Sequence, residues 1–243
     1  MKKKIFFTIV LVQILILSSC STNALSLEIY RSKSHEDQTE KYTPLVVTIS
    51  SSDINEKIKD VDFICVVDVS GSMSVEKLNL VKESLKYLLG IMDERDKFAL
   101  VTFSSSSSLI YDLNQMTKNN KNEIIKKINY LRAEGGTNIY SGLETGLSLL
   151  KENYISGEKI ASIILLSDGE DNYYYDLVVD KFKELLISNR KNDYAFTLHT
   201  FGYGVGHDAV LMNNISKIKD GGYFAIEKLS DVKEAFLKIY GYL

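Results

Sequence analysis

The chain has 243 residues, which is long enough to bury the core of one α/β domain. Hydrophobic residues make up 45% and charged residues 25%, and a single proline argues against a proline-rich stalk, so a compact globular domain is expected. With 29 basic and 32 acidic residues the formal net charge is −3, which disfavours nucleic acid and anionic membrane as main partners.

Residues 1–24 have the order of a secretory signal peptide. Three lysines are followed by the apolar run Ile5–Leu17 and then by small residues. The run is shorter than the roughly 18 residues that a membrane-spanning helix needs. Cleavage is expected near residues 19–24. Leu17-Ser18-Ser19-Cys20 resembles a bacterial lipoprotein box, which would lipidate Cys20, whereas Thr22-Asn23-Ala24 resembles an ordinary cleavage site, which would remove it.

The mature chain is expected to be secreted or lipid-anchored at the cell surface. Without the three lysines of the signal, 26 basic residues stand against 32 acidic ones, a net charge near −6. Contact with a membrane is therefore expected only through a possible lipid anchor at Cys20. The second cysteine, Cys65, lies in an apolar run without a partner, so no disulfide framework is expected.

Residues 25–43 are polar and lack periodicity, which predicts a flexible segment or an early edge element before a folded domain at residues 44–243. In that domain, short apolar runs alternate with helical periods. Runs that are apolar almost throughout indicate strands covered on both faces. These runs are Leu45–Ile49, Val61–Val69, Phe98–Phe103, Ile160–Leu166, Ala195–Phe201 and Tyr223–Ile226.

Apolar residues three or four positions apart predict amphipathic helices between the strands. A short strand near Leu109–Leu113 follows Phe98–Phe103 too closely for a helical crossover, so it should run antiparallel at the sheet edge. The expected fold is therefore α/β, with a doubly wound, mostly parallel central sheet, one antiparallel edge strand and helices on both faces. The helices are marked by Leu78, Val81, Leu85 and Leu88, by Ile124, Ile128 and Leu131, by Ile139, Leu143, Leu147 and Leu150, by Val178, Phe182 and Leu185, by Leu211, Ile215 and Ile218, and by Val232, Phe236 and Ile239.

Oxygen-bearing side chains follow two of the predicted strands and precede one predicted helix. Asp68-Val69-Ser70-Gly71-Ser72 ends the first core strand, Ser167-Asp168-Gly169 follows Ile160–Leu166, and Gly135-Gly136-Thr137 opens a helix. Ligands of open α/β sheets bind beyond the carboxyl ends of the strands, so these oxygens are expected to meet at one point. Oxygen ligands suit hard cations such as Mg²⁺.

Asp68-x-Ser70-x-Ser72, Thr137 and Asp168, in this order, resemble the metal-ion-dependent adhesion site (MIDAS) of the von Willebrand factor type A domain. The resemblance covers roughly Pro44 to the C-terminus. It implies that the two serine hydroxyls bind Mg²⁺, Mn²⁺ or Ca²⁺ directly, and that the threonine and the two aspartates act directly or through water. If the two aspartates act through water, the neutral hydroxyls leave much of the cation's charge uncompensated, and a Glu or Asp carboxylate of a partner protein is expected to complete the coordination.

Each of these residues also has an ordinary structural explanation. Asp68 could cap a turn, Ser70 and Ser72 could start a helix, and Asp168-Gly169 is a common turn pair. The occurrence of all five residues in the expected order favours the metal site.

The loop after Asp168 carries two acids and three tyrosines. These residues could form a rim that contacts a partner, or they could be ordinary loop residues, and both alternatives remain open. The candidate partner-binding residues are Glu170, Asp171, Tyr173, Tyr174 and Tyr175.

The leading hypothesis is a non-enzymatic, cation-dependent protein-binding module. One alternative is a metal-assisted hydrolase or phosphoryl-transfer enzyme. It is disfavoured because the sequence has no G-x-x-x-x-G-K-[ST] loop, no G-x-S-x-G elbow and no H-E-x-x-H motif. The other alternative is a domain that has the fold but does not use its metal.

Overall fold

The computed structural model separates the chain into two compact units, Met1–Ile58 and Lys59–Leu243. In the first unit, β1 (Leu25–Arg31) and β2 (Leu45–Ser51) form a two-stranded antiparallel sheet in which Leu25 lies opposite Ser51. The predicted signal peptide and Cys20 lie outside the described residues. The structure describes residues 25–31, 45–51, 60–73, 75–153, 160–174, 177–188 and 194–242.

The prediction that Leu45–Ile49 is a strand is confirmed, but the prediction that it joins the core sheet is wrong. β2 pairs with β1, and β1 lies within residues 25–43, where a flexible segment or an early edge element was expected. The sequence LSLEIYR of β1 alternates apolar and polar residues, which is the period of a half-buried strand. An apolar run shows that a segment favours a strand, but it does not identify the strand with which it pairs.

The second unit contains a six-stranded sheet with the order β5-β4-β3-β6-β7-β8. All neighbouring strands are parallel except β4 and β5, which are antiparallel at the edge. The predicted fold class is therefore confirmed. The strands are β3 (Val61–Asp68), β4 (Lys97–Phe103), β5 (Ser107–Gln115), β6 (Ile160–Ser167), β7 (Thr197–Tyr203) and β8 (Tyr223–Ile226).

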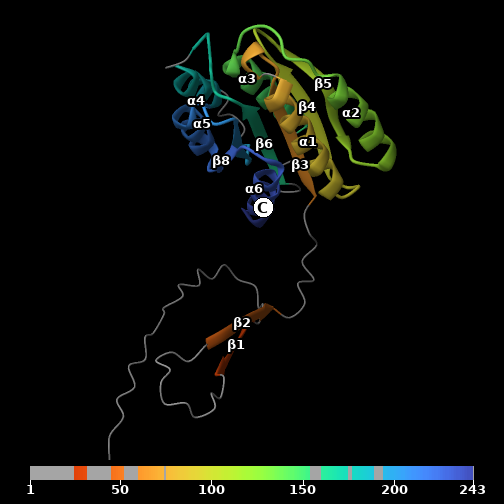
Figure 1. Cartoon of the computed structure of the whole chain (residues 1–243), viewed down its shortest axis with the longest axis vertical. Coiled ribbons are helices and arrows are strands. Elements are labelled where there is room, and N and C mark those ends of the chain that lie inside the picture. Colours follow the sequence, from red (N-terminus) through yellow and green to blue (C-terminus); the bar gives the residue numbers. More distant parts are fainter. Residues whose placement is uncertain are drawn as a thin grey trace, which may run out of the picture. The chain divides into compact units, whose positions relative to one another are not determined.

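Helices cover both faces of this sheet, as Figure 1 shows. α1 (Val75–Ile91), α2 (Lys118–Tyr130) and α6 (Leu229–Tyr242) pack on one face. α3 (Ile139–Asn153), α4 (Val178–Ser188) and α5 (Ala209–Ser216) pack on the other. Short 3₁₀ turns at Gly71–Met73 and Lys217–Lys219 precede α1 and follow α5. Within the described part of the chain, no helix combines the length and apolarity needed to cross a membrane.

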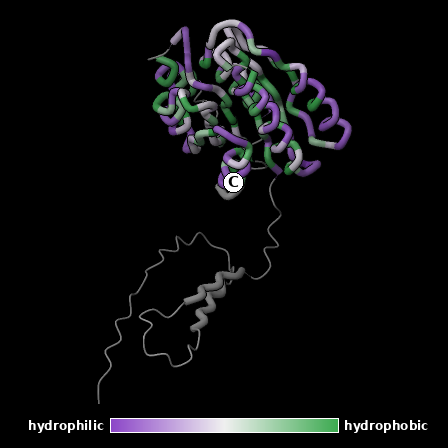
Figure 2. Tube along the Cα trace, in the orientation of Figure 1, coloured by the Kyte–Doolittle hydropathy of each residue, from purple (hydrophilic) through white to green (hydrophobic). Residues whose placement is uncertain are grey.

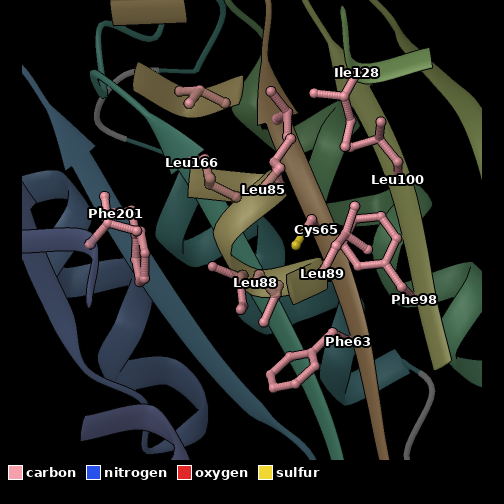
Figure 3. Packing of buried hydrophobic residues seen from close by; sticks show 14 of the residues in the cluster. Phe63, Cys65, Leu85, Leu88, Leu89, Phe98, Leu100, Ile128, Leu166 and Phe201 are labelled. Atoms are coloured by element: carbon pink, nitrogen blue, oxygen red, sulfur yellow. The ribbon is translucent and has the colours of Figure 1, made fainter. Parts of the chain in front are cut away.

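β3 is the centre of the core, because every residue from Val61 to Asp68 is buried. On one face, Phe63 and Cys65 lie among side chains of α1 and the neighbouring strands (Figure 3). Figure 2 shows the same arrangement along the chain, with apolar residues on the strands and polar residues on the outer parts of the helices. Cys65 is a free cysteine, and its burial raises the pKa of its thiol far above the usual range, so the thiol stays protonated and unreactive.

The strand order changes direction at β3. The chain passes from β3 to β4 on one side, and β6 pairs with β3 on the other. At such a switch point, the connections from the two neighbouring strands run in opposite directions. Open α/β sheets bind their ligands in the crevice that this leaves beyond the carboxyl ends of the strands. Asp68 ends β3, and Asp168 directly follows β6. The topology therefore brings these two acids to the switch point.

Two glycines allow α3 to lie very close to the sheet. A Cβ atom at Gly142 would lie 2.5 Å from Phe103 Cδ1 and 2.9 Å from Val66 Cγ1. At Gly146 it would lie 2.8 Å from Val66 Cγ2. Thr137 lies two residues before α3, so the depth of this helix also determines where Thr137 lies.

His199 on β7 is a buried polar residue on the face covered by α6. Its side chain is 1% exposed, and its Nδ1 accepts a hydrogen bond of 2.9 Å from the Gly222 backbone N–H. Among the described residues, Nε2 has no hydrogen-bond partner. Burial lowers the pKa of His199 from 6.5 to about 4, so the ring is neutral in the folded protein.

The substitution Gly142→Ala should destabilise the domain by about 1–3 kcal/mol, because the added methyl group overpacks the contact with Phe103 and Val66. The matched control is Gly90→Ala on α1, where a Cβ atom would meet nothing within 4 Å. This control should gain up to about 1 kcal/mol from helix propensity. Urea unfolding of the three proteins measures both effects. A Gly142→Ala variant as stable as its control would contradict the close packing.

His199 should make the domain less stable in acid. Its folded pKa lies below the unfolded value, so the unfolded chain takes up the proton first as the pH falls below about 6.5, and up to about 3 kcal/mol is lost by pH 4. His199→Phe should lack this loss. The free energy of unfolding is measured for both proteins between pH 7 and pH 4, and the two values are subtracted at each pH. Subtraction removes the contribution of groups that both proteins share. One of these is Asp68, whose raised pKa stabilises the folded protein as the pH falls. If the difference in unfolding free energy between the two proteins does not change with pH, His199 does not have a lowered pKa in the folded protein.

Candidate metal centre

The loop that follows β3 folds around its own side chains. Asp68 Oδ1 accepts a hydrogen bond of 2.8 Å from the Ser70 backbone N–H, which closes a tight turn after the strand. The hydroxyl oxygens of Ser70 and Ser72 lie 3.0 Å apart. Asp68 and Ser70 are fully buried, while Ser72 is partly exposed. The loop therefore holds three oxygen-bearing side chains close together, with one of them at the surface.

The loop that follows β6 joins this group from the neighbouring strand. Ser167 Oγ donates a hydrogen bond of 2.6 Å to Asp68 Oδ2, and Ser72 Oγ donates one of 3.2 Å to Asp168 Oδ1. Asp168 is also fully buried. The ends of the two strands are thus connected twice through side-chain hydrogen bonds.

The loop before α3 is held against both of these loops through its backbone. Gly71 N–H donates to Gly135 O at 3.0 Å, and Glu134 N–H donates to Val69 O at 2.7 Å. Thr137 is attached on its other side to Asn172, whose Oδ1 accepts from Thr137 N–H at 3.0 Å and whose own N–H donates to Thr137 O at 2.9 Å. Thr137 is 2% exposed. All three predicted loops therefore meet at the carboxyl edge of the sheet.

Two buried carboxylates give this place a strongly negative character. Burial raises the pKa of Asp68 to about 6, and the Asp168 carboxylate acts in the same direction, while hydrogen bonds from Ser167 and Ser70 oppose the shift. Asp168 has a basic partner, because Lys77 Nζ on α1 lies 2.8 Å from its Oδ2. Two negative charges thus face one positive charge within the protein.

The donor atoms at this place fit a hard divalent cation. All five predicted ligands carry oxygen, three of them as neutral hydroxyls, and Mg²⁺ prefers oxygen ligands. Within the described residues, no three His, Cys, Asp or Glu side chains gather in a way that could hold a metal. A cation here would therefore depend on Ser70, Ser72 and Thr137 in addition to the two aspartates.

The candidate partner-binding residues differ in their exposure. Glu170 is exposed, and Tyr173 is 51% exposed beside Gly136. Tyr174 is half-buried, with its ring 5.7 Å from that of Tyr140, edge to face, and with Lys181 Nζ 4.4 Å from its centroid. Tyr175 lies outside the described residues.

Asp171 fastens the loop rather than facing solvent. It is 5% exposed, its Oδ2 accepts from Ile139 N–H at 2.8 Å, and its Oδ1 accepts from Tyr173 N–H at 2.9 Å and Tyr174 N–H at 2.5 Å. The carboxylate therefore connects the first residue of α3 with the loop after β6. Contact with a partner through Asp171 would require this loop to open.

Sequence reasoning missed three residues that shape the site. Ser167 bonds Asp68, Asn172 anchors Thr137, and Lys77 pairs with Asp168. A polar residue at the end of an apolar strand was a usable signal for Ser167. For Asn172 and Lys77 no local signal exists, because their contacts depend on how separate elements pack.

The strand order and the helices on both faces of the sheet define a doubly wound α/β domain. The family of the von Willebrand factor type A domain matches residues 62–238, which is most of the second unit and more than half of the chain. The chain belongs to this family.

Relatives occur among bacterial and animal proteins. The uncharacterized protein YfbK of Escherichia coli strain K12 is 32% identical over 198 residues, which are 80% of this chain and 33% of YfbK. A solved von Willebrand factor type A structure from Catenulispora acidiphila has a TM-score of 0.64 at 21% identity and covers 80% of this chain and 44% of its own. The structure of proximal thread matrix protein 1 from the mussel byssus, with a zinc-occupied MIDAS motif, has a TM-score of 0.59 at 22% identity. The match covers 75% of this chain and 46% of the mussel protein's chain. The chain spans less than half the length of each of these relatives.

Asp171→Ala should destabilise the domain by about 2–4 kcal/mol, because three backbone N–H groups lose a charged acceptor. The neighbouring exposed acid supplies the control, since Glu170→Ala should change stability by less than about 0.5 kcal/mol. Guanidinium unfolding measures both variants. Equal, small effects would show that the connection through Asp171 contributes little.

Proposed function

We propose that the second unit is a divalent-cation-dependent protein-binding module. The cation is held by Asp68, Ser70, Ser72, Thr137 and Asp168, and a Glu or Asp carboxylate of a partner protein completes the coordination. Mg²⁺ is the expected cation, with Mn²⁺ and Ca²⁺ as alternatives. Members of the von Willebrand factor type A family often mediate protein interactions, and some of them do so with a metal site.

One observation carries the proposal: oxygen side chains from separate loops gather at the switch point of the sheet. Hydrogen bonds of 2.8 to 3.2 Å run from Asp68 through Ser70 and Ser72 to Asp168. The loop that carries Thr137 is bound through its backbone to the loop after β3, and Thr137 itself is bonded to Asn172 in the loop after β6. Clustered carboxylate and hydroxyl oxygens are the kind of donor set that a hard divalent cation takes.

A carboxylate ligand follows from the charge of the donors. Three neutral hydroxyls do not reduce the charge of a cation, and both aspartates already accept hydrogen bonds from the protein. Where the two aspartates act through water, a bound divalent ion therefore keeps part of its positive charge at the open coordination position, where an outside anion can bind. Ser72 is the partly exposed member of the group, so a partner would approach from its side.

The composition and the surroundings of the site favour a protein partner over a substrate. The acidic balance of the chain disfavours nucleic acid. The exposed residues Glu170 and Tyr173 border the site and are available for contact with a partner. We place the protein outside the cell, secreted or anchored through Cys20, on the basis of residues 1–24. We propose binding rather than catalysis, since the sequence has no G-x-x-x-x-G-K-[ST] loop, no G-x-S-x-G elbow and no H-E-x-x-H motif.

The metal part of the proposal is tested by calorimetric titration of the full chain with Mg²⁺, Mn²⁺, Ca²⁺ and Zn²⁺, the last because the mussel protein holds zinc. Thr137→Val should weaken cation binding by about tenfold or more, because it removes a hydroxyl ligand and keeps the shape of the side chain. The control is Thr145→Val on α3, whose hydroxyl bonds Ser107 away from the site. This variant should bind the cation like the wild type.

Negligible heats for the wild type with every cation would support a domain that has the fold without using a metal. Equal affinities for wild type and Thr137→Val would place the cation elsewhere. The adhesion part is tested by a pull-down from extracellular material with and without chelator. A partner that is retained in chelator and by Thr137→Val would point to a different surface.

A further inference from the structure

Lys77 brings a positive charge from α1 into the candidate metal centre. It lies in the first turns of that helix, and its Nζ donates a hydrogen bond of 2.8 Å to Asp168 Oδ2. The lysine side chain is 25% exposed and the aspartate side chain is fully buried. The pair is therefore much less screened by water than a surface ion pair.

The course of the lysine side chain is supported by a glycine. Gly204, which follows β7, has a φ of +87°, and a Cβ atom there would lie 2.9 Å from Lys77 Cε. A side chain at position 204 would thus disturb the methylene groups of the lysine. Gly204 leaves room for the stem of Lys77 to pass over the loop and to reach Asp168.

The pairing uses one oxygen of Asp168 and leaves the other on the side of the serines. Oδ2 receives Lys77, whereas Oδ1 receives Ser72 Oγ at 3.2 Å and Glu170 N–H at 3.4 Å. Lys77 therefore contacts the carboxylate at the oxygen that does not bond Ser72. The ammonium group and a cation beside Ser72 can share the same carboxylate.

We propose that Lys77 sets the charge of the metal centre, so that it weakens cation binding and strengthens the binding of an anionic partner. This inference rests on the proposed function. Asp68 and Asp168 contribute two negative charges, and a divalent cation alone would neutralise them. With Lys77 in place the cation-loaded site has one positive charge in excess, which repels the cation and attracts a carboxylate.

A merely structural ion pair predicts a different pattern. If Lys77 only fastened α1 to the loop after β6, its removal would loosen the site and weaken both the cation and the carboxylate. The charge-setting role predicts opposite changes in the two affinities. This contrast separates the two roles without a known partner.

The test uses the full chain, with Lys77→Met as the main variant, because methionine keeps an unbranched stem over Gly204 and removes the charge. Mg²⁺ affinity is measured by calorimetry at constant ionic strength. Carboxylate affinity is measured on the Mg²⁺-saturated protein from the thermal shift caused by acetate, with acetamide as the neutral counterpart. Lys77→Met should bind Mg²⁺ about tenfold more tightly and acetate about tenfold more weakly, the size expected for removal of one charge from a partly buried site.

Two further variants serve as controls. Lys77→Arg keeps the charge and should stay close to the wild type in both measurements. Lys86→Met removes a lysine from the same helix that pairs with Glu83 3.0 Å away, at the surface, and it should change neither affinity.

The outcomes separate this inference from the proposed function. Opposite changes in Lys77→Met, or Mg²⁺ binding that appears only in this variant, support the inference. Unchanged affinities, or a loss of both, overturn it while a wild type that binds Mg²⁺ keeps the proposed function intact. If neither protein binds Mg²⁺, the metal site and the role of Lys77 both fail.

Discussion

Asp68 and Asp168 end neighbouring parallel strands, and neither side chain is exposed to water. A buried carboxylate is unfavourable unless hydrogen bonds or positive charge compensate it. Here the compensation comes from Ser167, from the backbone of Ser70, from Ser72 and from Lys77. The loops around the switch point are shaped by this requirement. The same arrangement collects the oxygen atoms that a cation could use.

Much of the fold could be predicted from the sequence, because burial on both faces leaves a direct record in strand composition. β3 reads VDFICVVD and is buried throughout, and the helix that packs on it repeats apolar residues at helical spacing. The partner of each strand was harder to predict from the sequence. Leu45–Ser51 is apolar enough for a core strand, yet it pairs with Leu25–Arg31, since complementary strand edges rather than apolar content select the partner.

The five candidate ligands could be named from the sequence because each lies at a fixed place relative to a strand end or a helix start. Their supporting residues could not. Lys77 reaches Asp168 only because Gly204 leaves space for its stem, and Asn172 holds Thr137 only because two loops meet. Contacts of this kind arise from tertiary packing, and the local pattern contains no trace of them. Asp171 is a related case, since an acid next to a site can equally be a partner contact or a buried acceptor.

Affinity for the cation and attraction for the partner oppose each other in a site of this design. Every negative charge that the domain neutralises itself leaves more of the cation's charge for an outside carboxylate, and it also loosens the cation. In the role that we propose for it, Lys77 shifts this balance towards the partner. A loosely held cation makes occupancy follow the surrounding concentration, because binding saturates only well above the dissociation constant. A module of this kind works best where divalent cations are abundant, which agrees with the location outside the cell that residues 1–24 predict.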